Sequence, residues 1–370
     1  MKRVLSLIII FFMFIGNIAY SKKPGIKTPS ISSWYAVVMD YESGRVLYEK
    51  DCKKVVPMAS TTKIMTAIVA IENSSLKEIV TISKKASSVG GSTIGLREGQ
   101  NLTIEELLYG LMLQSGNDCA IAIAEHVAGS VEKFMVMMNS KAFDIGAFNS
   151  HFITPHGLDS DGHFTTAYDL ALITRYAMNI ELFAEIVSSK DIILDGAMGT
   201  RKFHNINKLL WSYDGADGVK TGYTGKAGKC LVSSASHNEK RIICIVLNSS
   251  SRWDDSKKLL EFGFKNFDNR IVLNNSDYYK KIPVTMGDKK ELSVGFSETL
   301  DIPITVEEKD SLSIEISLPN AINAPVYKGM QIGKLILYSN GKEILSVPYK
   351  AMDSIDKFDT RSIIDKIFVK

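Results

Sequence analysis

The sequence predicts an α+β fold, in which an antiparallel sheet is flanked by helices, followed by a second, smaller all-β domain. Before residue 270 the chain carries a strand hairpin, several helical patterns and then three strands in a row, an order typical of helices packed on one antiparallel sheet. Beyond about Ile271 only short alternating segments separated by turn residues follow. The length of 370 residues and a hydrophobic content of 45% suffice for two cores.

The N-terminus predicts export. Lys2 and Arg3 precede an uncharged stretch over residues 4–18, and Ala19-Tyr20-Ser21 provides a small-x-small cleavage signal. We interpret residues 1–21 as a signal peptide and the polar residues 22–33 as a linker. An uncleaved membrane anchor is the alternative interpretation of the apolar stretch. The protein is therefore expected outside the cytoplasm, at the outer face of the membrane or in the cell wall.

Charge and cysteine content narrow the function classes. Loss of Lys2 and Arg3 lowers the formal net charge of +3 to +1, which provides no field that would steer the protein to nucleic acid. The cysteines are widely spaced in a chain too large to need disulfides, and three of them lie in apolar surroundings, so buried thiols are favoured over disulfides. These three are Cys119, Cys230 and Cys244.

The predicted catalytic domain, residues 34–270, begins with strands at 34–39 and 45–49. Helices are predicted from Ser60, from a Thr103/Glu106 capping box to about Gln114, and from Asp118 to Gly129. Two more follow, one capped near Ser130 and stopped at Gly146, and one opened by Thr166 and Asp169; Met138, Phe143 and Tyr176 are assigned to the core. The last elements are strands at 219–223, 230–236 and 241–247 and a helix at 254–267.

Residues 271–350 predict a sandwich-like β domain of short strands. After it, residues 351–370 are predicted to be an amphipathic segment in which apolar residues recur at helical spacing: Ile355, Phe358, Ile363, Ile364, Ile367 and Phe368. Residues 354–370 could lie on a membrane surface, or they could dock on the β domain. Charge does not decide between the two, because lysines and aspartates balance one another here.

Ser60 and Lys63 are the first pair of candidate catalytic residues. Three residues apart at a helix start, they would share one face, where a lysine with a lowered pKa could activate the serine. The start of a helix also offers free N–H groups that can stabilise negative charge on a substrate oxygen. However, the same Ser-x-x-Lys pattern occurs at Ser74, Ser130, Ser339 and Ser354, so the pair needs further support.

That support comes from two later motifs in a fixed order. Ser115-Gly116-Asn117 falls on the short connection between two predicted apolar helices, and Lys220-Thr221-Gly222 lies on the first of the late strands. Taken singly, Ser115 and Asn117 could be mere helix-capping residues. Together the three motifs form the signature of penicillin-recognising serine acyltransferases.

The chain resembles the low-molecular-mass penicillin-binding proteins that are D-alanyl-D-alanine carboxypeptidases, the S11 serine peptidases. The likeness spans residues 34–266 and includes residues 57–63, 111–118, 155–159 and 218–224. It implies a fold like that of serine β-lactamases and DD-transpeptidases. Cys119 stands where the family pattern leads us to expect alanine. The β-rich part and the amphipathic end resemble the family's second domain and membrane anchor.

The resemblance implies a role for each motif residue. Ser60 would form an acyl-enzyme with the peptidoglycan stem peptide, or with a β-lactam, while Lys63 takes its proton and Ser115 relays a proton to the leaving amine. Asn117, Lys220 and Thr221 would hold the substrate, and Gly222 would let the backbone approach it. The oxyanion hole would consist of the N–H groups of Ser60 and Tyr223. No cofactor is implied.

Five points stay open at this stage. Arg252 is either a second partner for the substrate carboxylate or a surface arginine. A metal site at His156, Asp159, Asp161 and His163 is disfavoured, because these residues are also common turn material. A β-lactamase is the rival enzyme, although no Glu-x-x-Leu-Asn pattern lies between Asn117 and Lys220. A DD-endopeptidase acting on cross-links would use the same residues, and a wall-binding protein with an idle site is the non-enzymatic alternative.

Overall fold

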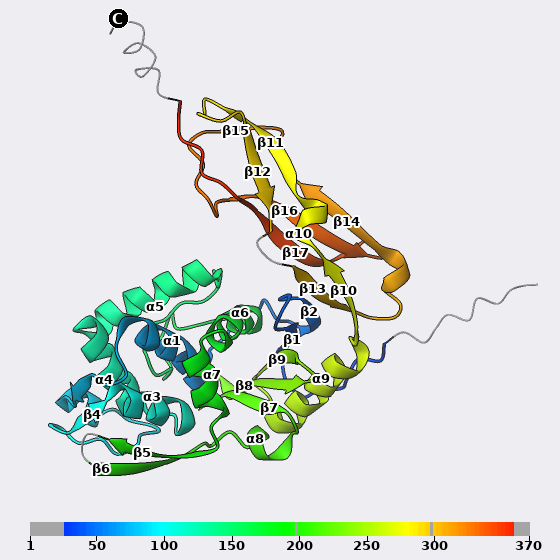
Figure 1. The fold of residues 1–370 in the computed structure, drawn as a ribbon. Helices are drawn as coiled ribbons and strands as arrows, with labels where there is room; N and C mark the ends of the chain where they lie inside the picture. The colour runs from blue at the N-terminus through cyan, green and yellow to red at the C-terminus, as the bar shows by residue number, and fades with distance from the viewer. Residues whose placement is uncertain (1–25, 197–198, 297–298, 359–370) are drawn as a thin grey trace, which may run out of the picture.

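A computed structural model describes residues 26–196, 199–296 and 299–358 of the chain. It contains a larger part built from helices and a central sheet, and a second part made of strands (Figure 1). The signal peptide and most of the C-terminal segment predicted from the sequence lie outside the described residues.

The central sheet is antiparallel throughout and has the strand order β2-β1-β9-β8-β7. Its strands are β1 (Tyr35–Asp40), β2 (Val46–Lys50), β7 (Ala216–Thr224), β8 (Gly228–His237) and β9 (Lys240–Leu247). Alternate residues of a strand point to opposite faces. Val37 and Met39 accordingly join the core beneath one set of helices, whereas Ala36 and Val38 join the core on the other face.

Most of the helices cover one face of this sheet, and α9 covers the other (Figure 1). On the first face α1 is almost wholly buried between its neighbours. The helices are α1 (Lys63–Asn73), α2 (Lys84–Ser87), α3 (Ile104–Leu113), α4 (Asn117–Ala128), α5 (Val131–Ile145), α6 (Ala167–Met178), α7 (Glu181–Ser188), α8 (Leu209–Ser212) and α9 (Arg252–Asn266). Two hairpins complete this part: β3 (Ile79–Thr81) with β4 (Asn101–Thr103), and β5 (Asp191–Gly196) with β6 (Gly199–His204).

Several local signals in the sequence determine the helix ends as predicted. Thr103 and Glu106 form both hydrogen bonds of a capping box at the start of α3. Ser130 caps α5, and Gly146 ends it in the left-handed conformation. Thr166 caps α6 by accepting a hydrogen bond from the N–H of Asp169.

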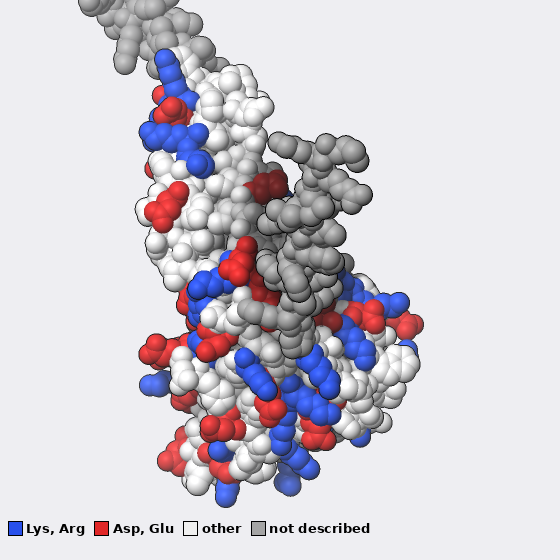
Figure 2. Space-filling model, turned by 90° about the vertical axis from the view of Figure 1, so that its right-hand side faces the viewer, with Lys and Arg blue, Asp and Glu red and all other residues white. Residues whose placement is uncertain are grey.

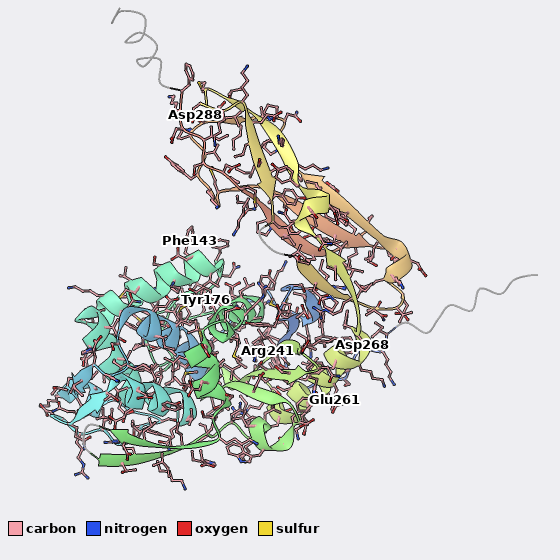
Figure 3. All side chains as sticks on the ribbon, in the orientation of Figure 1. Phe143, Tyr176, Arg241, Glu261, Asp268 and Asp288 are labelled. Carbon is pink, nitrogen blue, oxygen red and sulfur yellow. The ribbon has the colours of Figure 1, made fainter. Side chains whose placement is uncertain are left out.

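One core assignment was wrong. Phe143 has the spacing of a core residue, but its side chain is 69% exposed on the outer side of α5, where it packs edge-on against Phe148 (Figure 3). Met138 is fully buried. The helical period therefore predicted the helix correctly. The buried face of that helix is narrower than the pattern suggests, and Phe143 lies outside it.

The β part has a six-stranded sheet in the order β14-β16-β17-β12-β11-β15 and a separate pair, β10 with β13. Leu273 and Ile302 from that pair share one buried cluster with the larger sheet. The elements are β10 (Asn269–Leu273), α10 (Asn275–Tyr278), β11 (Lys280–Thr285), β12 (Glu291–Gly295), β13 (Leu300–Ile304), the turn η2 (Lys309–Ser311), β14 (Leu312–Ser317), β15 (Ile322–Asn323), β16 (Gln331–Ser339) and β17 (Lys342–Ala351). The predicted fold class, helices on an antiparallel sheet plus an all-β domain, is confirmed.

The described chain ends at the tip of the β part farthest from the helices, beside Asp288 (Figures 1 and 3). Ile355 pairs with Val326 and is fully buried, and Lys357 pairs with Gly287. The helical spacing that includes Ile355 thus does not produce a helix there, because backbone pairing with the β part fixes residues 355–357 in extended form.

Candidate active site

Ser60 lies in the turn η1 (Ala59–Thr62), which leads directly into α1. Pro57 precedes the turn, as expected for a residue that lacks an N–H donor and is disfavoured inside a helix. Lys63 is the first residue of α1, and its Nζ lies 2.9 Å from Oγ of Ser60. The three-residue spacing therefore brings the hydroxyl and the amine together, as the sequence predicts.

The surroundings of Lys63 match a neutral amine. Nζ lies 2.7 Å from Oδ1 of Asn117 and 2.7 Å from the carbonyl oxygen of His156. Both oxygens can only accept, so they take the two protons of a neutral amine. The remaining lone pair is left for the hydroxyl of Ser60, which is the arrangement a general base requires.

The electrostatics of Lys63 favour that neutral form. Its side chain is completely buried, and burial lowers the pKa of Lys63 well below its usual value. The positive charge of Lys220 lowers the pKa of Lys63 further, whereas Cys119 and Asp118 oppose the shift. Burial and the charge of Lys220 thus both favour the neutral amine of Lys63 over its ammonium form.

The Ser115-Gly116-Asn117 motif connects α3 to α4, as the sequence predicts. Asn117 begins α4 and is nearly fully buried; its Nδ2 donates to the carbonyl of Gly90 at 2.7 Å, so its Oδ1 is the atom that faces Lys63. Ser115 adopts a left-handed backbone conformation with φ of 64° and is 4% exposed. Among the described residues its hydroxyl has no hydrogen-bond partner, so it remains available to a ligand.

The Lys220-Thr221-Gly222 motif lies on β7, the edge strand beside η1. A Cβ placed on Gly222 would come within 3.2 Å of the nitrogen of Ser60, so glycine permits this close approach. Lys220 and Thr221 are buried, whereas the ring of Tyr223 is 67% exposed. Burial, with a contribution from the charge of Arg252, lowers the pKa of Lys220 to about 7.

Arg252 supports this strand from behind. Its Nη1 donates to the carbonyl of Gly222 at 2.8 Å and to that of Cys230 at 3.2 Å, and its guanidinium lies 4.9 Å from the ring centre of Trp253. These contacts make it a half-buried residue that joins β7 to β8 at Gly222, and its charge reaches Lys220. Arg252 is therefore tied by its side chain to the strand that carries Lys220 and Gly222.

Several contacts of the site were missed by sequence reasoning. The carbonyls of Gly90 and His156 hold Asn117 and Lys63, and main-chain groups carry no residue-type signal. Asp118, nearly fully buried, accepts hydrogen bonds from the N–H groups of Ile94 and Leu96 and so fixes the loop that supplies Gly90. The sequence features that could have predicted these main-chain contacts are the Gly90-Gly91 pair and the Pro155-His156-Gly157 turn.

The candidate metal residues bind protein groups instead. His163 interacts with the N–H of Ile153 and the hydroxyl of Thr62, and Asp159 accepts a hydrogen bond from Thr224 at 2.7 Å. Across residues 26–358, apart from the two short gaps, no group of three or more His, Cys, Asp or Glu side chains could hold a metal ion. All four cysteines are free and buried.

Comparison with known proteins agrees with this geometry. Residues 22–251 match the peptidase S11 family, described as D-alanyl-D-alanine carboxypeptidase. The chain belongs to this family. Residues 267–357 match the C-terminal domain of penicillin-binding protein 5.

Individual relatives of this S11 chain match over nearly its whole length. D-alanyl-D-alanine carboxypeptidase DacF of Bacillus subtilis (strain 168) is 32% identical over 371 residues, covering 96% of this chain and 95% of the relative. The structure of penicillin-binding protein 5 from Haemophilus influenzae has a TM-score of 0.72 at 30% identity and covers 90% of this chain and 100% of its own. The structure of D-alanyl-D-alanine carboxypeptidase DacD from Francisella tularensis has a TM-score of 0.69 at 28% identity. It covers 93% of this chain and 99% of its own.

The family assigns the enzyme class that the sequence predicts. Members of the S11 family are serine hydrolases that act on D-Ala-D-Ala peptides of peptidoglycan through an acyl-enzyme, and they bind β-lactams. The predicted carboxypeptidase class is therefore confirmed for this chain.

Proposed function

We propose that this S11 carboxypeptidase removes the terminal D-alanine from peptidoglycan pentapeptides with Ser60 as nucleophile and Lys63 as general base. The observation that carries the proposal is the set of three contacts around Nζ of Lys63. Two acceptors occupy its protons, and the hydroxyl of Ser60 lies at 2.9 Å, where the lone pair can take a proton.

The reaction follows from that contact. Oγ of Ser60 attacks the carbonyl carbon of the penultimate D-alanine as its proton passes to Lys63, and the negative charge on the carbonyl oxygen meets the N–H groups of Ser60 and Tyr223. Ser115, whose hydroxyl is buried and has no hydrogen-bond partner among the described residues, donates its proton to the leaving amine and takes up the proton that Lys63 holds, so Lys63 is neutral again when D-alanine departs. Water then attacks the ester carbonyl as Lys63 accepts its proton, and Lys63 returns that proton to Oγ of Ser60 as the ester bond breaks.

Substrate recognition falls to the other motif residues. Asn117 holds the amide of the substrate, and Lys220 and Thr221 bind its terminal carboxylate. Lys220, whose pKa is lowered to about 7 by burial and by the charge of Arg252, becomes more strongly protonated when a carboxylate binds beside it. Arg252 positions Gly222 and Lys220 and adds positive charge behind them.

The site of action proposed is extracytoplasmic. The predicted signal peptide supports export, and the amphipathic residues after 358 support contact with a membrane surface. None of the described helices has the length and apolar character needed to cross a membrane. On the face in Figure 2, acidic and basic side chains are interspersed over the helical part, so no single-sign field attracts a polyanion there.

The experiment compares the purified protein with Ser60→Ala and Lys63→Ala, using labelled penicillin and a D-Ala-D-Ala pentapeptide. We expect stable labelling of the wild type, release of one D-alanine, and loss of both in the two variants with unchanged circular dichroism. Labelling that persists in Lys63→Ala would show that another base acts. Rapid penicillin turnover without peptide cleavage would favour a β-lactamase, and cleavage of cross-linked dimers would favour an endopeptidase.

A further inference from the structure

His163 is buried beside the turn that carries Ser60, and the positions of its protons follow from its partners. Its Nδ1 lies 3.0 Å from the nitrogen of Ile153, and a main-chain N–H can only donate, so Nδ1 accepts and carries no proton. The neutral ring therefore has its proton on Nε2, which lies 2.8 Å from Oγ1 of Thr62. His163 thus donates to Thr62.

Thr62 passes this bond on to the backbone of the turn. Its hydroxyl donates its single proton to the carbonyl oxygen of Ala59 at 2.8 Å. The hydroxyl oxygen can therefore only accept from Nε2–H of His163. The carbonyl of Ala59 and the N–H of Ser60 belong to one planar peptide group. A force that fixes the direction of the Ala59 carbonyl also fixes the direction of the Ser60 N–H.

This peptide group needs support. Ala59 has φ of 50°, a left-handed conformation that costs a residue with a side chain roughly 1–2 kcal/mol. The carbonyl of Ala59 also lies against Gly157, where an added Cβ would come within 1.9 Å of the oxygen. Gly157 therefore blocks one side of the carbonyl, and Thr62 holds it by a hydrogen bond.

We propose that His163 is a positioning residue for the oxyanion hole: through Thr62 and the Ala59 carbonyl it sets the direction of the Ser60 N–H. The inference rests on the proposed role of Ser60 and extends it to a residue that does not touch the substrate. Because a chain of hydrogen bonds also polarises its members, the same relay strengthens the hold on Ala59.

The kinetic consequence is specific. A misdirected oxyanion donor weakens binding of the transition state more than that of the substrate, so the acylation rate and kcat fall while KM changes little. We expect a loss of about 10-fold, less than the 100-fold or more that follows complete removal of such a donor. A purely structural role would instead lower the folded fraction and leave the kcat of the folded enzyme unchanged.

The test uses the full chain and two variants of similar shape, His163→Phe and Thr62→Val, with penicillin acylation, pentapeptide turnover and thermal unfolding measured for each. His163→Gln keeps an N–H donor near the place of Nε2 and should recover most of the rate, as should Thr62→Ser. The double variant should be no slower than the slower of the two single variants, because both residues act through one relay. Matched controls are His126→Phe on α4 and Thr174→Val, a buried hydroxyl of α6 that bonds Leu170 at 2.6 Å.

The outcomes separate this inference from the proposed function. If the wild type is not labelled by penicillin, the proposed function fails. If the wild type is labelled and the folded His163→Phe and Thr62→Val variants acylate at the wild-type rate, the positioning role is refuted. It is also refuted if the losses multiply in the double variant, or if His163→Gln is as slow as His163→Phe.

Discussion

Lys220 and Lys63 are two buried amines whose charges oppose each other: after burial itself, the positive charge of Lys220 is the main cause that lowers the pKa of Lys63. One motif therefore tunes the base of another, although 157 positions of sequence separate Lys63 from Lys220.

Lys220→Gln should move the acid limb of the acylation rate to higher pH. Lys63 accepts a proton only when it is neutral, and removing the charge of Lys220 raises the pKa of Lys63. The measurement is the rate of penicillin acylation from pH 5 to 10, with the exposed Lys334→Gln as control. A limb that stays in place or moves to lower pH would contradict the coupling.

Acid should destabilise the fold through His156 and His163. Burial is the first cause that lowers their pKa values, to about 3 and about 4, from an ordinary value near 6.5. The unfolded chain binds more protons in this range, so stability is full above pH 6.5 and falls as the pH drops towards 4. Urea unfolding at pH 7 and pH 4.5 measures the loss, which should be smaller in His163→Gln; an equal loss would exclude His163 as a source.

Gly157→Ala should damage the Ser60 turn far more than Gly162→Ala. Both glycines have a left-handed backbone, with φ of 87° and 80°, so each substitution costs about 1 kcal/mol of strain. Only at Gly157 would the new Cβ also strike the Ala59 carbonyl, at 1.9 Å; at Gly162 the nearest atom is 3.8 Å away. Acylation should fall at least about 10-fold in Gly157→Ala and stay near wild type in Gly162→Ala; similar rates in both would show that the turn tolerates the contact.

Arg45→Ala should weaken the contact between the helical part and the β part and lower the stability of the protein. The buried guanidinium of Arg45 donates to the carbonyl of Pro303 and pairs with Glu308, both in the β part, and lies 5.3 Å from the ring centre of Phe267. We expect the free energy of unfolding, measured by calorimetry, to fall by about 2–4 kcal/mol. The substitution removes the guanidinium and leaves the carbonyl of Pro303 and the carboxylate of Glu308 without their partner in a largely buried place.

The control for Arg45→Ala is Lys281→Ala. The ion pair between Lys281 and Glu291 spans 3.4 Å, and both side chains are more than half exposed. Loss of this pair should lower the free energy of unfolding by less than about 1 kcal/mol. Equal losses in the two variants would show that Arg45 contributes no more than a surface charge.

Deleting residues 359–370 should release the mature protein from membranes. The cut belongs after Phe358, because Ile355 is buried in the β part and its removal would open that core. The tip beside the cut exposes Met286, Tyr327 and Phe358, which suits contact with lipid. Sedimentation with anionic vesicles measures binding; equal recovery with and without the segment would exclude it as the anchor.

Local sequence signals predicted most of the fold. They failed where contacts between segments distant in the sequence determine the conformation. The capping residues Thr103 and Ser130 specified helix starts because a cap depends only on its own turn. The helix α7 and the hairpin of β5 and β6 were not predicted. Ile355 fits a helical period, yet its pairing with Val326 holds it extended.

The sequence by itself determined the identity and order of the three motifs, and the helix spacing that places Ser60 beside Lys63. Only the tertiary structure decided what makes Lys63 a candidate base: burial, the nearby charge of Lys220, and acceptors at Asn117 and His156. The reason is physical. Spacing fixes which side chains of one helix are neighbours, whereas the dielectric environment and the direction of main-chain carbonyls arise only when distant segments pack together.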